Sequence, residues 1–538
     1  MRRSWPRVVA LLVAGGLAFS ACARDAADPR DNPTHDGDTS HFTPGVYEES
    51  DPGEPTSGGT LTFAAFSEAR SLDPTKTIAT GYSGGNALVA VYDQLVRWNV
   101  REEKFEPRLA ESVEPNDDHT EWTITLREGA TFSDGTPVNA DAVVGSFEYY
   151  VKNKGFDMAV IGPLWGGAEK VDDRTVRVNL TESWATFPFA LGLGMGFIVA
   201  PAAIEKGPEG FTPIGAGPFT LDSYSPTEEL VLAKNPKYWD GEPHLDKLRF
   251  VWLGADQTKY ESLNGDQVQA AVIRDVDIIK KARDADLPGW VSNDNVGTGI
   301  LVNRADGRPA GEYPEIVLAM AHAIDEKALY DRVFDGLGLP SKHLFGPQSP
   351  WHHADAKSPE YDPDKATELL NKAKEKGFDG RIVNTTLATP VSRDQAMIIK
   401  AQLEAVGFTV ENDFIRTVAD HSVKTQVERD FDVNRSAQAI TDIDPYWRLY
   451  SAFHSSSVAN ISSYHDPEMD KLIDELREAA GDDRADVLRR VEEKVAADMP
   501  VIPLGAGIAM VGWTADAHGI NPTNDGMVGF EKAWLSKK

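Results

Sequence analysis

The sequence predicts an α/β protein in which strands and helices are interleaved along most of the 538 residues. Three patterns support this class. Residues 121–127 alternate apolar and polar side chains, as a half-buried strand does, and residues 362–377 carry an apolar stripe at helical spacing. The two kinds of segment follow one another without a strict strand–helix–strand rhythm. This order favours a mixed sheet over a fully parallel one.

Three segments are predicted as strands. In residues 121–127 every second side chain from Trp122 to Leu126 is apolar, and the threonines between them take the opposite face. Residues 175–180 alternate in the same way, and residues 245–253 form a third, longer candidate.

Three helices have clear boundary signals. Asp362 is placed to cap a helix that begins at Pro363, and Gly377 is placed to end it. The Asp-Pro pair at 466–467 repeats the same device, and residues 486–498 carry a third apolar stripe.

The first residues resemble a secretory signal that leads to a lipid attachment site. A basic start is followed by an uncharged run of 13 residues, Val8–Ser20, which is too short to span a bilayer core of about 30 Å. Cys22 is the only cysteine, so the chain contains no pair for an internal disulfide. The run 19–22 (FSAC) resembles the lipobox of bacterial lipoproteins, with Phe19 where leucine is commonest. We therefore expect residues 1–21 to be a signal peptide and Cys22 to carry lipid; an incidental thiol is the alternative.

Residues 22–58 are predicted to be a flexible tether. They are rich in Asp, Glu, Pro, Gly, Ser and Thr and hold few aliphatic side chains, so they offer little apolar surface to bury. The expected location is the extracytoplasmic face of the cell membrane, held there by the lipid anchor.

The rest of the chain exceeds one hydrophobic core, so two or three domains are expected. The formal net charge is −30, and no basic cluster suits nucleic acid, which excludes that class of partner. Acidity of this degree suits solubility and does not identify a ligand.

Catalytic signatures are weak. Neither a zinc-protease H-E-x-x-H nor a phosphate-binding G-x-x-x-x-G-K-[ST] is present. Residues 81–85 match G-x-S-x-G around Ser83, but the preceding residues 73–77 are polar and contain proline, so a glycine-rich loop is predicted instead of a nucleophile elbow. His352 and His353 are adjacent, so on regular structure their rings point apart; a loop that brings both onto a metal stays open.

Two further patterns are ambiguous. Residues 191–196 are rich in glycine without a strand–helix context, which favours a close-packed crossing over a phosphate loop. Acidic pairs are abundant, and a glycosidase pair stays open because the sequence does not give the distance between two carboxylates.

Several segments, taken in order, resemble one family. The sequence is similar to the signature regions of family 5 extracellular solute-binding proteins, which are the oligopeptide, dipeptide and nickel-type receptors of ATP-binding-cassette (ABC) importers. The segments that carry the resemblance are 92–97 (YDQLVR), 107–112 (PRLAES), 132–138 (FSDGTPV), 213–219 (PIGAGPF), 235–239 (NPKYW), 263–268 (LNGDQV), 319–325 (AMAHAID) and 500–504 (PVIPL). Each motif is weak alone, but their order and spacing run from about residue 58 to the C-terminus.

The resemblance implies a two-lobed periplasmic-binding-protein fold of the class II or cluster C type, with mixed sheets and an extra inserted domain. The expected divisions are lobe I at 59–90, 199–290 and 500–538, inserted domain II at 91–198, and lobe III at 291–499. The ligand is then held between the lobes, which close about a hinge.

The resemblance also implies which residues contact the ligand. In peptide-type members an aspartate in a D-x-x-D-P-like motif holds the ligand's amino group. The corresponding run here is 439–447, in which Thr441 stands where the aspartate is usual, while Asp442 lies one place nearer to Asp444. A shift of one residue turns a strand side chain to the opposite face, so an N-blocked peptide, sugar or metal chelate stays open as the ligand. The predicted contacts are Asp442, Asp444, Tyr82, Trp447 and Arg435.

The expected function is that of a receptor and not of an enzyme. It captures a peptide or other small solute and delivers it to ABC permease subunits with their ATPase. No cofactor or metal is expected, and the protein is expected to be a monomer. Two alternatives stay open: an enzyme that uses Ser83 on a similar cleft, and a sensing lipoprotein without transport.

Overall fold

The structure, a computed structural model, describes residues 38–48 and 53–536. The predicted signal peptide, Cys22 and much of the predicted tether therefore lie outside the described residues. Within the described part, no helix is both long and apolar enough to cross a bilayer.

The largest sheet has eleven strands and is mixed, as the sequence predicts. Its order is β15-β14-β16-β13-β17-β12-β2-β11-β10-β9, with β1 beside β13. The neighbours β14/β15, β14/β16, β11/β2 and β12/β2 are parallel, and the other pairs are antiparallel. The strands are β1 Gly45–Tyr47, β2 Thr60–Ala64, β9 Phe219–Ser225, β10 Glu229–Lys234, β11 Lys247–Val251, β12 Ala270–Ile273, β13 Gly289–Val302, β14 Arg381–Leu387, β15 Thr409–Ile415, β16 Val433–Ser436 and β17 Val501–Trp513.

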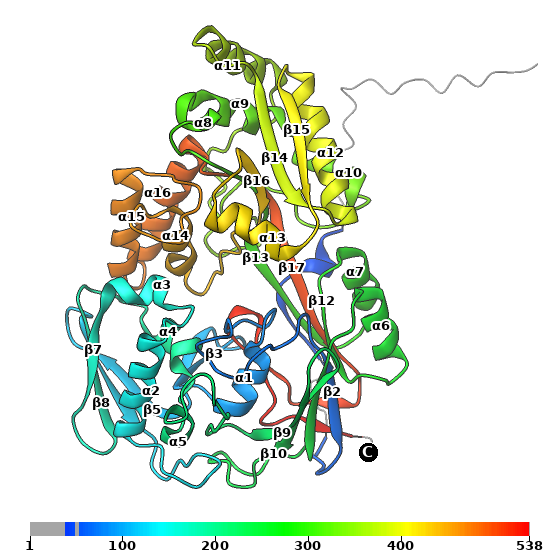
Figure 1. Cartoon of the computed structure of the whole chain (residues 1–538). Coiled ribbons are helices and arrows are strands. Elements are labelled where there is room, and N and C mark those ends of the chain that lie inside the picture. The colour runs from blue at the N-terminus through cyan, green and yellow to red at the C-terminus, as the bar shows by residue number, and fades with distance from the viewer. Residues whose placement is uncertain (1–37, 49–52, 537–538) are drawn as a thin grey trace, which may run out of the picture. The chain divides into compact units, whose positions relative to one another are not determined.

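Strands β13 and β17 are the long central pair of this sheet and connect its two ends (Figure 1). Their pairing shifts register between Asp294 and Thr298, where Val296 takes a φ of +51°. A Cβ added at Gly297 would lie 1.9 Å from the backbone nitrogen of Gly507. The two backbones therefore approach more closely than any side chain allows, which explains glycine at this crossing.

A second, antiparallel sheet forms a separate layer in the middle of the sequence. Its order is β5-β6-β8-β7, and helix α2, Ala140–Lys152, covers it. The strands are β5 Ala110–Pro115, β6 Glu121–Leu126, β7 Trp165–Lys170 and β8 Thr175–Leu180. The predicted strands at 121–127 and 175–180 are confirmed as β6 and β8, and the third, at 245–253, is the shorter β11.

The three predicted helices are confirmed. Asp362 caps α11, Pro363–Glu375, and Asp466 caps α15, Pro467–Glu478, each by accepting backbone N–H bonds. Helix α16, Asp483–Asp498, begins three residues earlier than predicted. The remaining helices are α1 Gly85–Tyr92, α3 Met158–Ile161, α4 Pro188–Leu191, α5 Pro201–Ile204, α6 Asp256–Asn264, α7 Val276–Asp284, α8 Pro309–Glu312, α9 Glu315–Ala323, α10 Glu326–Val333, α12 Pro390–Ala405, α13 Val418–Ser422 and α14 Pro445–Phe453.

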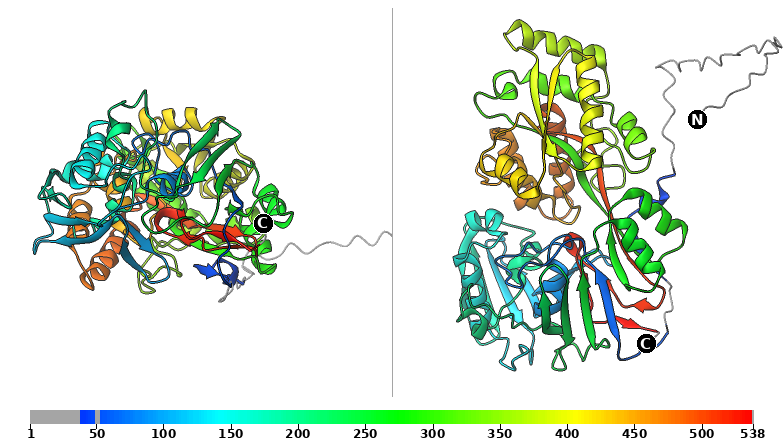
Figure 2. Two further views of the ribbon diagram at one scale, coloured as in Figure 1. Left: turned by 90° about the horizontal axis from the view of Figure 1, so that it is seen from below. Right: turned by 45° about the vertical axis from the view of Figure 1, so that its right-hand side comes forward.

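Helices pack against strands at both ends of the eleven-stranded sheet. Helix α12 runs along β14 and β15 (Figure 2), and α14, α15 and α16 pack together as a bundle (Figure 1). Short elements complete the fold: η1 Ser40–Phe42, η2 Gly162–Leu164, η3 Gly194–Gly196, η4 Val423–Val427, η5 Asn524–Gly526, and the two-stranded pairs β3 Val96–Asn99 with β4 Lys104–Pro107, β18 Ala517–His518 with β21 Trp534–Leu535, and β19 Asn521–Pro522 with β20 Val528–Gly529.

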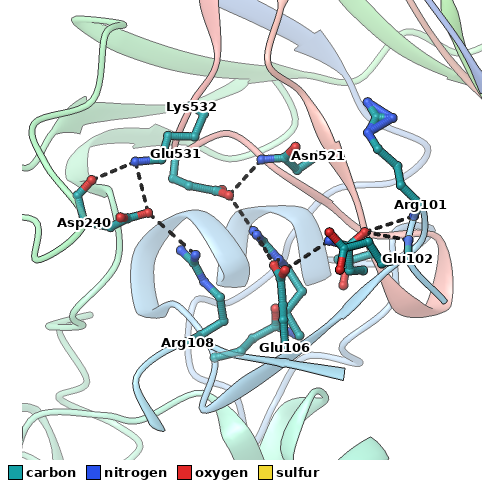
Figure 3. A network of polar contacts seen from close by, with 12 residues as sticks. Arg101, Glu102, Glu106, Arg108, Asp240, Asn521, Glu531 and Lys532 are labelled. Atoms are coloured by element: carbon teal, nitrogen blue, oxygen red, sulfur yellow. Dashed lines mark hydrogen bonds and ion pairs between the residues drawn. The ribbon is translucent and has the colours of Figure 1, made fainter. Parts of the chain in front are cut away.

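An ion-pair network ties the C-terminal segment to the β3–β4 pair (Figure 3). Glu531 lies 2.5 Å from Arg97, which also pairs with Glu106 at 2.6 Å. Burial alone would raise the pKa of Glu531, but the guanidinium groups of Arg97 and Arg108 outweigh it and hold that pKa at about 2.

The flexible tether predicted for residues 22–58 is wrong for its described middle part. Residues 40–42 form a short 3₁₀ turn, and β1 pairs with β13. Phe42 is 1% exposed in a core with Val291 and Met510. The Arg283 guanidinium lies 3.4 Å from the centre of the Tyr47 ring. The prediction failed because the average composition hid a few apolar side chains that a sheet edge and a hydrophobic pocket can order.

The loop predicted for residues 81–85 and the close packing predicted for residues 191–196 are both observed. No strand leads directly into residues 81–84, which form a turn before α1. Residues 191–196 are buried, and a Cβ at Gly196 would lie 1.7 Å from the carbonyl oxygen of Leu191. Close packing, and not phosphate binding, explains these glycines.

Candidate ligand-binding site

Five side chains meet where β13 and β17 cross, and we call them the crossing cluster: Tyr82, Arg274, Asp294, Arg448 and Asp525. The Arg274 guanidinium lies 4.8 Å from the centre of the Tyr82 ring. Arg448 Nη2 lies 3.3 Å from Asp525 Oδ2. The charges of Asp525, Arg274 and Arg448 all act on the ionisation of Asp294.

Separate elements hold these side chains. Tyr82 precedes α1, and the neighbouring Gly81 N–H donates to the carbonyl of Asp525 at 2.9 Å. Arg274 follows β12, and Arg448 lies on α14. Asp294 is the last β13 residue before the register shift. The cluster therefore joins segments that are distant in sequence, as expected of a site between lobes.

Carboxylates outnumber cations at this place. Burial raises the pKa of Asp294 to about 6, and the negative charge of Asp525 adds to the rise. Burial also raises the pKa of Asp157 to about 6, although the Tyr150 hydroxyl donates to its Oδ2 at 2.9 Å. The charge of Asp525 thus acts on two further carboxylates, those of Asp157 and Asp294, beside two guanidinium groups. Such a site favours one further cation.

Asp442, a predicted ligand contact, lies beside the cluster. Its Oδ1 accepts from Asn295 Nδ2 at 2.7 Å and from Ser349 Oγ at 2.6 Å. Its backbone carbonyl accepts from Trp351 Nε1 at 2.8 Å. Burial raises the pKa of Asp442, and its charge acts on Asp294. Its Oδ2 accepts no hydrogen bond from the residues that the structure describes.

Asp444 and Trp447 are structural in this arrangement. Asp444 is fully buried, with Arg484 Nη2 3.0 Å from Oδ1 and Thr186 Oγ1 3.0 Å from Oδ2. Trp447 is 5% exposed and packs against Trp184 and Phe189. Neither side chain belongs to the cluster, and Asp444 exposes no atom to a ligand. Two residues of the motif at 439–447 therefore have structural positions: Asp444 lies at the start of helix α14, and Trp447 lies in an aromatic core.

Arg435, like Arg274 of the crossing cluster, is a cation near the crossing that pairs with no carboxylate of the described residues. It lies on β16 opposite Ile300 and is half-buried. None of the described carboxylates lies within 4.0 Å of it, and its Nε has no hydrogen-bond acceptor there. Burial lowers its pKa, and the nearby Tyr330 acts against that shift. The Tyr330 hydroxyl packs against Gly505 of β17, which places this pair beside the crossing.

Four residues of the crossing cluster were not predicted from the sequence: Arg274, Asp294, Arg448 and Asp525. One sequence pattern did point to the region of Asp294. Residues 292–295 (SNDN) form a polar run within the largely apolar segment 289–302, which marks a place where a long strand leaves the core. Asp525 stands before Gly526 in a turn and takes a φ of +57°, which is common for Asp-Gly. Nothing in the sequence connects these positions to Tyr82.

Two cavities in the described part of the chain lie away from the crossing cluster. One of about 530 Å³ lies beside Trp513, His518 and Trp534, and another of about 500 Å³ lies beside His322 and Glu493. Neither is lined by a residue of the crossing cluster.

Residues 104–460 match the family described as "Bacterial extracellular solute-binding proteins, family 5 Middle". The chain is 26% identical over 471 residues to heme-binding protein A of Haemophilus influenzae. The matched region covers 80% of this chain and 84% of that protein. It is 27% identical over 380 residues to the dipeptide-binding protein of Escherichia coli, covering 65% and 70%.

Solved structures share the fold. The oligopeptide-binding protein AppA from Bacillus subtilis, in complex with a nonapeptide, superposes with a TM-score of 0.75 at 20% identity, covering 90% of this chain and 100% of that one. The binding protein AgaA from A. tumefacien R10, in complex with agropinic acid, gives 0.75 at 24% identity, covering 89% and 99%. These likenesses confirm the expected two-lobed, mixed α/β periplasmic-binding-protein fold. With the family match over most of its length, the chain belongs to family 5 of the bacterial extracellular solute-binding proteins.

Proposed function

We propose that the protein is a lipid-anchored receptor that captures a peptide between its lobes and passes it, chemically unchanged, to an ABC importer. Family membership supports solute binding. The relative named as a dipeptide-binding protein supports a peptide as the solute.

The crossing cluster is the observation that carries the peptide assignment. A peptide with free ends presents one ammonium and one carboxylate. The excess of the three carboxylates of Asp157, Asp294 and Asp525 over two guanidinium groups suits the ammonium, and the guanidinium of Arg435 suits the carboxylate. Asp294 then takes the role that the family motif leaves vacant at Thr441. Asp442, in the adjoining loop, contributes a second carboxylate near the ammonium. Its Oδ2 accepts no hydrogen bond from the described residues and is the oxygen that would accept one from the ligand.

Hinge closure is proposed at the crossing of β13 and β17. The register shift after Asp294 and the glycine contact of Gly297 with Gly507 concentrate a change of direction in a few residues. A ligand favours the closed form only through its excess affinity for that form. The cluster draws side chains from several elements, so a ligand bound there gains contacts only when those elements converge. The lobe and domain divisions expected from the sequence remain part of this proposal.

The sequence around Cys22 and the family support the proposed lipid anchor and importer. A lipid on Cys22 would keep the receptor at the extracytoplasmic face of the membrane, where proximity to the permease raises the effective concentration. The proposed partners are permease subunits with their ATPase, and the receptor acts as a monomer without catalysis.

A thermal-shift screen tests the ligand class. Di- to octapeptides would be compared with nickel chelates, oligosaccharides and heme, the last because one relative is named as heme-binding. Tight binding raises the melting temperature by mass action. A shift with peptides supports the proposal. A shift with only a sugar, chelate or heme would replace the peptide, and turnover of a bound compound that is lost in Ser83→Ala would replace the receptor by an enzyme.

The alternative of a sensing lipoprotein is tested separately. A permease and an ATPase encoded beside the receptor gene, and loss of peptide uptake on its deletion, support transport. Peptide binding without any change in uptake would favour sensing.

A further inference from the structure

A second polar cluster lies away from the crossing, between helix α16 and the loop that follows Ser341. It contains His343, His352 and Glu492, and one nitrogen or oxygen of each lies within 4.8 Å of those of the other two. The sequence left open a metal site shared by His352 and its neighbour His353. The structure instead brings His352 to His343, nine residues earlier in the loop, with ring centres 5.4 Å apart.

Glu492 is the unusual member of this cluster. The residue is 1% exposed, and neither carboxylate oxygen accepts a hydrogen bond from any residue of the described chain. Taking a carboxylate out of water without a partner costs several kcal/mol. Its nearest cation candidate is His343, whose Nδ1 lies 3.4 Å from Oε1. Charge-assisted hydrogen bonds measure about 2.7–2.9 Å, so this contact does not satisfy the carboxylate.

His352 is oriented as a ligand. Its Nδ1 lies 2.9 Å from the backbone carbonyl oxygen of Phe345, so Nδ1 carries the proton and donates. The lone pair is then on Nε2, on the opposite side of the ring. Metal-binding histidines are commonly held in this way, with one ring nitrogen bound to a carbonyl and the other to the ion. His343 Nδ1, which is buried, has no hydrogen-bond partner among the described residues either.

We propose that His343, His352 and Glu492 bind a divalent transition-metal ion, with zinc as the preferred ion. Two imidazoles and one carboxylate form a ligand set that zinc accepts, with a fourth position left to water. Ligand atoms about 2.1 Å from a tetrahedral ion lie about 3.4 Å from one another. The separation of His343 Nδ1 and Glu492 Oε1 already has this value, at 3.4 Å. The site holds the ion as a structural staple that also neutralises Glu492.

The staple has a defined mechanical role. It fastens the loop of residues 343–352 to α16. The same loop supplies Ser349 and Trp351, which hold the carboxylate and the carbonyl of Asp442. A bound ion therefore stiffens the support of the crossing cluster without touching the peptide itself.

Zinc titration of the full chain in detergent, after treatment with a chelator, tests the site. We expect ZnCl₂ to raise the melting temperature of the wild-type protein and Co²⁺ to give the visible absorption of a tetrahedral site. Glu492→Gln and His352→Gln should each weaken zinc binding by more than the roughly 10–100-fold that loss of an outer-shell partner causes. His353→Gln is the matched control, since it removes an adjacent histidine that is not in the cluster, and it should bind zinc as the wild type does.

The outcomes are distinct. If neither ion binds the wild-type protein, or if both variants bind zinc as tightly as His353→Gln does, the site is overturned and Glu492 with His343 forms only a strained ion pair. If Glu492→Gln fails to fold, the half-buried His352→Gln decides the question. The test needs no peptide, so its failure leaves the receptor proposal untouched.

Discussion

The carboxylate of Asp444 lies 3.0 Å from the guanidinium of Arg484, and both side chains are buried. The other oxygen of Asp444 accepts from Thr186. Thr186 lies next to Trp184, whose fully buried ring packs on Tyr446 of α14. A motif that suggested a ligand contact is thus a joint between helices α14 and α16 and the segment before α4.

Asp444→Ala should therefore reduce stability far more than it changes ligand affinity. Removing one partner of a buried ion pair leaves the other charge unpaired and costs about 3–5 kcal/mol. Urea unfolding at neutral pH measures this loss. The double variant Asp444→Leu with Arg484→Met should recover most of it, since no charge is left buried. A loss below about 1 kcal/mol in the single variant would contradict the structural role.

Asp294→Asn should weaken the binding of peptides with a free amino end. Loss of the charge-assisted bond is expected to cost about 1.5–3 kcal/mol, or roughly 10–150-fold in Kd, by isothermal titration calorimetry. An N-acetylated copy of the same peptide is the control, and the variant should bind it as the wild type does. Equal losses for both peptides would show that Asp294 does not hold the amino group.

The pH dependence of stability and peptide affinity in the wild-type protein and in Asp294→Asn is a separate prediction. The pKa of Asp294 is raised to about 6 from an ordinary value of 3.8, so its favourable contribution to folding is present below about pH 4 and is lost as the pH rises through 6. At pH 7.5, Asp294→Asn should raise the free energy of unfolding by about 1–3 kcal/mol. Peptide affinity of the wild type should fall below pH 6, where Asp294 takes up a proton. Arg274, Arg448, Asp442 and Asp525 are present in both proteins, so the difference between the two proteins reports on Asp294.

The element types were predictable because they depend on local signals. Asp362 and Asp466 cap their helices, and the alternation around Trp122 produces β6. Apart from Tyr82, the crossing cluster was not predictable, since its members meet only after β13 and β17 pair and α14 docks. Asp442 was found through the family motif, but Asp294 was not, because its strand carries no family motif and shows only a polar interruption.

Arg435→Gln should reduce affinity for peptides with a free carboxyl end by about tenfold or more. The half-buried guanidinium has no carboxylate partner within the described chain, so a ligand carboxylate is the group that would satisfy it. The C-terminally amidated peptide should bind the variant and the wild type equally. Arg381→Gln is the control variant, because that arginine is exposed on β14 and pairs with the exposed Glu411. An unchanged affinity for the free acid in Arg435→Gln would remove Arg435 from the site.

Gly297→Ala should destabilise the protein and disturb closure. The added Cβ would lie 1.9 Å from the backbone of Gly507, so one of the two strands must move, at a cost of about 1–3 kcal/mol. Peptide affinity should fall with stability, because the crossing sets how the lobes meet. Gly145→Ala is the control: its Cβ meets open space within α2, and it should stabilise by about 0.5–1 kcal/mol. Gly297→Ala with wild-type stability and affinity would contradict a close crossing.

The central claim is that the crossing of β13 and β17 holds a peptide and releases it unchanged. The most direct measurement is to incubate the protein with an equimolar mixture of di- to octapeptides, wash it, and identify the retained peptides by mass spectrometry. The account predicts intact peptides with free amino ends, retained by the wild type and much less by Asp294→Asn. Retention of no peptide, or recovery of cleaved peptides alone, would contradict it.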